Sequence, residues 1–219
     1  MNPFDAAYLE TPPWDIGRPQ DVFVKLEREG LIKGRVLDVG CGTGDLALYL
    51  TQKGHETWGV DASPRAIHLA AAKARESGAL VQLDDAPTKP GPNGQSVMAL
   101  RLQVGDALNL KKLGKTFDTA IDCGFFHALS DTGREKYKKS LESALSPGGA
   151  LHLLCFSESE PEWGGPRRVR QGELKSCFSG GWFIERLEAA RFENRLRPEG
   201  SHAWLLSATW VGRAAPGVN

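Results

Sequence analysis

The segment Val36–Asp45 constrains the fold more than any other part of this chain. Its sequence, VLDVGCGTGD, predicts a buried strand that enters a turn with three glycines and then a helix. Glycine lets the backbone adopt positive φ and approach a ligand closely, and the first amides of the next helix are unpaired donors. A strand, a glycine turn and a helix in this order are typical of nucleotide-like cofactor sites in open α/β sheets.

The positions of the glycines indicate which cofactor is bound. A dinucleotide fingerprint, G-x-G-x-x-G, needs its third glycine where this chain has Asp45. The glycines are instead Gly40, Gly42 and Gly44, in an acid-x-G-x-G-x-G pattern that begins at Asp38. A carboxylate in such a turn repels a pyrophosphate but pairs with a cationic ligand. The segment resembles motif I of the class I S-adenosylmethionine-dependent methyltransferases, whose cofactor carries an ammonium and a sulfonium.

A second acidic residue follows at a suitable spacing. The segment His55–Asp61 predicts a second strand, and Asp61 lies about 20 residues beyond Gly40, the offset at which an acid meets ribose hydroxyls in Rossmann-like units. The alternative is that Asp61 caps the next helix. Ser63, followed by Pro64, is the better cap. We therefore predict that Asp61 binds ribose.

The third strand is predicted over Met98–Val104, and Asp106 and Ala107 follow it. In the family that motif I resembles, an acid at this position contacts the adenine amino group, so the resemblance implies this role for Asp106 and the backbone of Ala107. The alternative is an ordinary turn aspartate. Residues 78–97, which precede the strand, are rich in proline and glycine and predict an exposed loop insertion.

Further apolar segments predict the rest of a sheet. Thr116–Asp122 and Ala150–Phe156 read as the fourth and fifth strands, with a Ser-Pro-Gly-Gly stop before the fifth. Trp182–Leu187 and His202–Val211 predict a terminal antiparallel hairpin. The resemblance implies an α/β fold with a Rossmann-like, doubly wound, seven-stranded sheet of order 3-2-1-4-5-7-6, in which strand 7 is antiparallel. Length and apolar content suit a single domain over residues 1–219.

The segment Thr11–Gln20, TPPWDIGRPQ, is too aromatic and too rich in turn residues for a disordered tail. It is similar to the P-W-D-x-G-x-P-Q segment of small-molecule methyltransferases related to thiopurine, thiol, halide and tellurite-resistance enzymes. In those relatives the N-terminal segment covers the cofactor. The resemblance therefore implies a lid over residues 1–20, with Tyr8, Trp14 and Gly17 as covering residues. The alternative for Trp14 is packing against the core.

The loop after the fourth strand is expected to line the reaction chamber, because ligands bind at the carboxyl ends of such strands. His127 lies there and is the candidate general base, since an imidazole with an ordinary pKa of about 6.5 accepts a proton from a thiol or an acidic hydroxyl. A packed structural histidine is the alternative. Phe125 and Phe126, together with Phe4 of the lid, indicate an apolar pocket for a soft or aromatic acceptor.

A second candidate patch follows the fifth strand and comprises Glu158, Glu160, Trp163, Arg167 and Arg168. The two arginines could bind an anionic acceptor, whereas adjacent arginines on a loop are more often solvated. With the resemblance, the complete prediction assigns cofactor binding to Trp14, Asp38, Gly40, Cys41, Gly42, Gly44, Asp61, Ala62, Asp106, Ala107, Asp122 and Cys123. It assigns acceptor binding to Tyr8, Trp14, Phe125, Phe126, His127, Arg167 and Arg168.

Composition restricts the partners. The 27 Lys and Arg balance 27 Asp and Glu, so the chain lacks the basic excess typical of nucleic-acid binding. The chain has neither a long apolar run nor a signal-peptide pattern, so we expect a cytoplasmic protein without a membrane or nucleic-acid partner, as a monomer or homodimer. The four cysteines lack paired or metal-like spacing, which predicts free thiols and no metal.

The function predicted from sequence is S-adenosylmethionine-dependent methyl transfer to sulfur or oxygen of a small aromatic, heterocyclic or thiol acceptor. A role in detoxification or secondary metabolism is implied by resemblance alone. An N-P-P-Y or D-P-P-Y tetrapeptide, typical of enzymes that methylate amino nitrogens, is missing after the fourth strand. The alternatives are a macromolecule methyltransferase, a non-catalytic cofactor-binding protein and, disfavoured by Asp45, a nicotinamide-dependent oxidoreductase.

Overall fold

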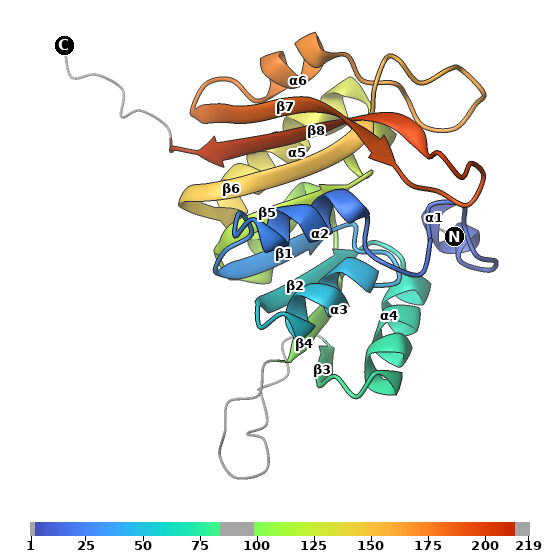
Figure 1. The fold of residues 1–219 in the computed structure, drawn as a ribbon. Helices are drawn as coiled ribbons and strands as arrows, with labels where there is room; N and C mark the ends of the chain where they lie inside the picture. Colours follow the sequence, from blue (N-terminus) through green and yellow to red (C-terminus); the bar gives the residue numbers. More distant parts are fainter. Residues whose placement is uncertain (1–2, 84–98, 213–219) are drawn as a thin grey trace.

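The computed structural model describes residues 3–83 and 99–212, which are built around one eight-stranded sheet (Figure 1). The strands lie in the order β3-β4-β2-β1-β5-β6-β8-β7. Their bounds are β1 Arg35–Val39, β2 Glu56–Asp61, β3 Val81–Leu83, β4 Leu100–Val104, β5 Phe117–Cys123, β6 Leu145–Phe156, β7 Trp182–Phe192 and β8 Ser201–Trp210. The strands β1 to β6 are parallel to one another, and β8 is antiparallel to both β6 and β7.

The predicted fold and strand order are confirmed, with one extra strand at the edge. The seven predicted strands are β1, β2, β4, β5, β6, β7 and β8, and without β3 their order is 3-2-1-4-5-7-6. The prediction of a loop over residues 78–97 was wrong at Val81–Leu83, which pairs in parallel with β4. Three residues are too few to show an alternating pattern in the sequence. The strand forms because the outer edge of β4 offers unpaired backbone groups to bond with. The rest of that insertion, from residue 84, lies outside the described residues.

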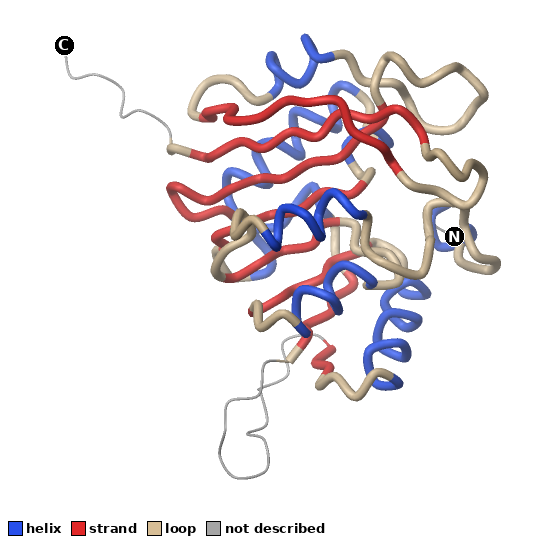
Figure 2. The backbone as a smooth tube through the Cα atoms, in the orientation of Figure 1, coloured by secondary structure: helices blue, strands red, loops and turns tan. Residues whose placement is uncertain are grey.

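Helices cover both faces of the sheet (Figures 1 and 2). The helix α2 (Asp21–Arg28) packs with α3 (Asp45–Gln52) and α4 (Pro64–Glu76) on one face. On the other face lie α5 (Asp131–Ala144), α6 (Gln171–Cys177) and the 3₁₀ segment η2 (Ala107–Leu113). Val36 and Leu37 of β1 point to opposite faces and join different core clusters, as the alternation of a strand requires. The remaining short elements are α1 (Pro3–Ala7) and η3 (Phe126–Ala128).

The start of α4 shows how local sequence sets an element that borders the site. The Ser63 hydroxyl accepts a hydrogen bond from the Ala66 amide at 3.0 Å, and Pro64 occupies the first turn. Alanines at helical spacing form most of the buried face, which lets the helix lie close to the sheet. The prediction that Ser63 is the cap is confirmed, so Asp61 is left available to the cavity.

Two general features follow from the described part of the chain. All four cysteines are free, as predicted. In residues 3–83 and 99–212 there is no helix with the length and apolarity that crossing a bilayer requires.

Candidate active site

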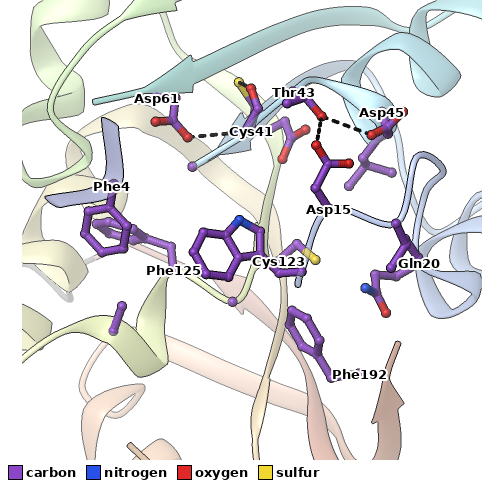
Figure 3. A pocket seen from close by; sticks show the side chains of 18 of the residues that line it. Phe4, Asp15, Gln20, Cys41, Thr43, Asp45, Asp61, Cys123, Phe125 and Phe192 are labelled. Atoms are coloured by element: carbon purple, nitrogen blue, oxygen red, sulfur yellow. Dashed lines mark hydrogen bonds between the residues drawn. The ribbon is translucent and has the colours of Figure 1, made fainter. Parts of the chain in front are cut away.

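A cavity of about 330 Å³ opens at the carboxyl ends of β1, β2, β4 and β5. Its wall combines the N-terminal segment, the glycine turn after β1 and the loops that follow β4, β5, β6 and β7. Figure 3 shows that Asp61, Thr43 and Asp45 lie along one side, whereas Phe192 lies on the other. We call the polar side, around Asp38, Gly40, Gly42, Asp61 and Asp106, the cofactor half. The side formed by Phe125, His127, Phe156, Trp163, Phe192, Asn194 and Leu196 is the acceptor half.

The glycine turn is held by Asp61 from the neighbouring strand. The Asp61 carboxylate accepts the Gly42 amide at 2.9 Å and the Ser63 amide at 2.8 Å, and it borders the cavity. Burial raises its pKa above the ordinary value. Gly42 has φ of +54°, and a Cβ there would lie 2.8 Å from the Tyr8 hydroxyl, so only glycine fits between turn and lid.

Asp38 at the end of β1 supplies a buried negative charge. Its side chain is 2% exposed, and within the described ranges its Oδ2 atom has no hydrogen-bond partner. Burial, together with the negative charge of Asp61, raises the pKa of this carboxyl to about 7. A buried carboxyl oxygen without a partner is costly unless a ligand supplies one. The expected cofactor, with its cationic ammonium group, fits this requirement.

The loop after β4 forms the end of the cofactor half. Asp106 caps η2, since one carboxylate oxygen accepts the Leu108 amide at 2.8 Å. It lines the cavity together with Gly105, Ala107 and, from the loop after β2, Ala62. Asp106 is therefore a turn aspartate, as the alternative prediction has it, and it also borders the cavity.

The N-terminal segment covers this half of the cavity. Asp15 accepts a hydrogen bond from the Thr43 hydroxyl at 2.8 Å, which ties the segment to the glycine turn (Figure 3). Trp14 is 40% exposed, lines the cavity and donates from its indole nitrogen to the Tyr8 hydroxyl at 3.3 Å. Trp14 therefore lies at the cavity rather than in the core. Gly17 does not border the cavity, and its amide donates to Asp15 within the turn.

A second set of contacts joins the same segment to the turn after β7. The Gln20 amide side chain donates to the Glu193 carbonyl oxygen at 2.8 Å and accepts the Glu193 amide at 2.7 Å. Arg18 forms an ion pair with the Glu193 carboxylate. The Arg195 amide donates to the Pro13 carbonyl oxygen at 2.8 Å. The cavity is thus closed by two segments that are far apart in sequence.

The loop that follows β6, residues 157–169, carries Trp163 to the acceptor half. Glu160 holds this loop: it accepts the His202 amide at 2.7 Å, the Trp163 indole at 2.6 Å and the Arg197 guanidinium at 2.9 Å. Glu158 accepts the Trp204 indole. The two glutamates of the predicted patch therefore position the loop, and neither lines the cavity.

The arginines of that patch lie outside the cavity as well, so the structure does not support the prediction that they bind the acceptor. Arg167 is engaged in ion pairs with Asp131 and Glu173. Arg168 donates to four backbone carbonyl oxygens of the same loop, including those of Gly164 and Pro166, both at 2.8 Å. Planar guanidinium groups with several donors suit this bridging of a loop to its own backbone.

Three further predicted residues support the cavity from behind. Gly44 starts α3 in the left-handed conformation, and a Cβ there would approach Ala70 to 2.8 Å, so it serves close helix packing. Asp122 is fully buried and accepts the amides of Phe125 at 2.8 Å and Phe126 at 3.1 Å. Phe126 is itself buried against Phe178. These three residues do not line the cavity, but they hold the segments that do.

His127 is located at the cavity as predicted, but its hydrogen bonding does not support a role as general base. Its Nδ1 accepts the Phe156 amide at 3.0 Å. Burial, together with the positive charges of Arg134 and Arg168, lowers the pKa of the imidazole to about 3. The ring is therefore neutral, and its one basic nitrogen is already occupied.

Several lining residues were missed by sequence reasoning. The prominent ones are Asp15, Gln20, Thr43, Phe156, Phe192, Asn194 and Leu196. Asp15, Gln20 and Thr43 lay inside segments already singled out, so their position next to quoted motifs was a usable signal. Phe192 and Leu196 carried no signal, because Phe192 is the last residue of a late strand and Leu196 lies in the turn that follows it. Within the described ranges, no cluster of three or more His, Cys, Asp or Glu side chains could hold a metal ion.

Comparisons with known proteins identify the family that the chain resembles. A family model described as thiopurine S-methyltransferase (TPMT) matches residues 9–206. The chain is 34% identical to the 2-heptyl-1-hydroxyquinolin-4(1H)-one methyltransferase of Mycobacteroides abscessus, over 93% of this chain and 88% of that protein.

Solved structures show the same fold. One, described as "Conversion of a Disulfide Bond into a Thioacetal Group during Echinomycin Biosynthesis", is 30% identical, with a TM-score of 0.77 over 94% of this chain and 90% of that one. Magnesium protoporphyrin IX methyltransferase of Synechocystis with bound S-adenosylmethionine has a TM-score of 0.62 at 21% identity, over 89% of this chain and 77% of that one.

Proposed function

Because the chain belongs to the thiopurine S-methyltransferase family and is an S-adenosylmethionine-dependent methyltransferase, we propose that it methylates an oxygen or sulfur of a small, planar aromatic acceptor. The observation that carries this proposal is the acceptor half of the cavity. Phe125, Phe156, Trp163 and Phe192 supply aromatic surface there, and the lid encloses it. Such a wall suits a flat apolar ring and excludes water from the reacting atoms.

The cofactor half supports a division of roles among its acids. When bound, S-adenosylmethionine supplies an electrophilic methyl group on its sulfonium. Asp38 pairs with the ammonium group, as its buried Oδ2 atom without a partner favours. Asp61 binds the ribose hydroxyls, and Asp106 accepts from the adenine amino group. Trp14 and Tyr8 cover the cofactor, so the chain contributes mainly orientation and desolvation.

Two findings bear on the acceptor atom. The Mycobacteroides abscessus relative is described as acting on a hydroxyquinolone, and this favours an oxygen on a fused aromatic ring. The solved structure related to echinomycin biosynthesis concerns a disulfide and a thioacetal, and this keeps sulfur as the second candidate. A macromolecular acceptor is disfavoured by the enclosed cavity and by the formal net charge of zero.

The test is release of S-adenosylhomocysteine by the purified protein with a panel of N-hydroxyquinolones, phenols, heterocyclic thiols and alkyl thiols. We expect turnover with the flat aromatic oxygen or sulfur acceptors and little with alkyl thiols. The variant Asp61→Ala should abolish this turnover. Asp118→Ala, at the opposite end of β5, is the matched control and should retain it. Cofactor binding without turnover on every member of the panel would contradict the proposal.

A further inference from the structure

We propose that His127 is a fixed hydrogen-bond donor whose Nε2–H binds the anionic oxygen or sulfur of the acceptor, so that the site selects acceptors that arrive already deprotonated. This inference rests on the proposed function and deepens it, because it names the chemical state of the substrate. It also gives His127 a role opposite to that of a base. Four observations lead to it.

The first observation is the tautomer. A backbone amide can only donate, so the 3.0 Å contact from the Phe156 amide requires a lone pair on His127 Nδ1. This contact arises because β6 extends beyond the end of its neighbour β5. β5 ends at Cys123, and its last link to β6 is the Gly124 amide donating to the Leu154 carbonyl oxygen at 2.9 Å. β6 continues to Phe156, whose amide therefore needs another acceptor. The imidazole fills this need and carries its proton on Nε2.

The second observation is where Nε2 points. His127 borders the cavity, and in the described part of the chain no residue accepts a hydrogen bond from its Nε2 atom. Nε2 is also not among the polar atoms that are sealed from solvent without a partner. It lies beside Gly124, where an added Cβ would be 3.3 Å away. The N–H is therefore available to a ligand next to the carboxyl end of β5.

The third observation is that the ring is locked as a neutral donor. The rings of Phe156 and Phe192 lie 4.5 and 5.7 Å from it, centroid to centroid, and pack against it. The charged groups that face it are Arg134 from α5 and Arg168 from the loop after β6, and both oppose a second proton. The imidazole thus keeps the same tautomer over the working pH range.

The fourth observation concerns the rest of the acceptor half. The carboxylates that line the cavity, Asp15, Asp38, Asp45, Asp61 and Asp106, belong to the lid and the cofactor half, and the residues that define the acceptor half carry none. The neighbouring Cys123 is a poor base, because burial and the nearby Asp38 raise the pKa of its thiol well above the ordinary value. In this proposal the acceptor loses its proton to solvent before it binds. Transfer is then balanced without a further proton: the carbon–sulfonium bond breaks, the carbon–oxygen or carbon–sulfur bond forms, and neutral S-adenosylhomocysteine remains.

The experiment uses 4-nitrophenol as a probe, because its anion absorbs visible light. The probe is bound to protein saturated with S-adenosylhomocysteine, and its pKa is measured by absorbance. Wild-type protein should lower the pKa of the bound probe by about one pH unit or more, since a hydrogen bond to a charged group favours the anion. Two variants test the roles of the two ring nitrogens separately. His127→Gln can place an amide near Nε2, whereas His127→Asn can only accept the Phe156 amide.

We expect His127→Asn to lose the lowered pKa of the probe and His127→Gln to retain most of it, while both bind S-adenosylhomocysteine normally. The variant His127→Asn preserves the contact to Phe156, so it controls for folding. An unchanged or raised probe pKa in wild-type protein, failure of the anion to bind, or equal behaviour of His127→Asn and wild type would overturn the inference. The readout needs no turnover. An inactive protein that still lowers the probe pKa would contradict the proposed acceptors but not this role of His127.

Discussion

The two halves of the cavity are built in different ways. The cofactor half is formed by residues at the ends of adjacent parallel strands, and its acids are held by neighbouring amides such as that of Gly42. The acceptor half is formed by loops and strand ends up to residue 196, and its wall is largely aromatic. One half is polar and is formed at the ends of adjacent strands, and the other is largely aromatic and is formed by loops that tertiary contacts hold in place.

This difference implies that the two halves can change separately. The cofactor half depends on backbone geometry that few residues can satisfy, so substitutions there should affect cofactor affinity. The acceptor half depends on packing and surface shape, which tolerate exchange among apolar residues. Its substitutions should affect acceptor affinity and leave cofactor affinity nearly unchanged. The following four predictions test this separation.

The largest effect is expected for Asp61→Ala. The proposed contacts of Asp61 are two charged hydrogen bonds to ribose, together worth about 3 kcal/mol, and their loss should weaken S-adenosylhomocysteine binding about 100-fold in isothermal titration calorimetry. Phe192→Ala, in the acceptor half, is the comparison variant and should change this affinity by less than about 3-fold. Similar losses in both variants would show that the halves are not independent.

The next effect is on the pH dependence of cofactor binding. The carboxyl of Asp38 has a pKa raised to about 7, so it is largely neutral below that pH, whereas a cationic ligand requires the ionised form. Affinity for S-adenosylmethionine should therefore fall by up to about tenfold for each pH unit below 7 and level off above it. Asp38→Asn should bind more weakly with a flat profile. A flat profile in wild-type protein would contradict the role of Asp38.

Trp163→Ala tests the acceptor half directly. Removing this aromatic wall should raise KM for an aromatic acceptor about tenfold, while the affinity for S-adenosylhomocysteine stays within about 2-fold. Trp163→Phe, which keeps a flat ring, should remain close to wild type in steady-state kinetics. If cofactor affinity fell together with acceptor affinity, the loop after β6 would have to be regarded as part of both halves.

The smallest effect is expected for the lid. Asp15→Ala removes the hydrogen bond to Thr43, worth about 1 kcal/mol, and should speed dissociation of S-adenosylhomocysteine about fivefold in stopped-flow measurements. Glu10, an exposed acid in the same segment, is the matched control, and Glu10→Ala should leave the rate unchanged. Equal rates in wild type and Asp15→Ala would indicate that the lid does not retain the cofactor.

The difference between the two halves also explains which residues of the cavity could be predicted from the sequence. The strand order and the positions of Asp38, Gly42 and Asp61 at the cavity were predictable, because each depends on a short contiguous pattern and on strand ends that meet at one edge. The prediction placed Asp122 correctly at the carboxyl edge of the sheet, but its carboxylate turns away from the cavity and accepts the loop amides of Phe125 and Phe126. Spacing alone cannot show which way a side chain turns.

The acceptor half was less accessible for a physical reason. The state of His127 depends on the Phe156 amide, which is 29 positions away in the chain. Arg167 and Arg168 looked free in sequence, but their partners lie on α5, α6 and the backbone of their own loop. Phe192 reaches the cavity only because β8 returns beside β6 and places β7 at the edge. Such contacts arise from tertiary packing.

The contacts of Gln20 and Arg195 across the cavity have a consequence for how the protein is made. A ribosome releases the N-terminal residues first, so the lid, the glycine turn and the strands β1, β2, β4 and β5 emerge well before residue 193. The two hydrogen bonds between the Gln20 side chain and the Glu193 backbone can form only after β7 has been synthesised. A growing chain therefore contains every defining residue of the cofactor half before the last residues of the acceptor half, Phe192, Asn194 and Leu196, have been made.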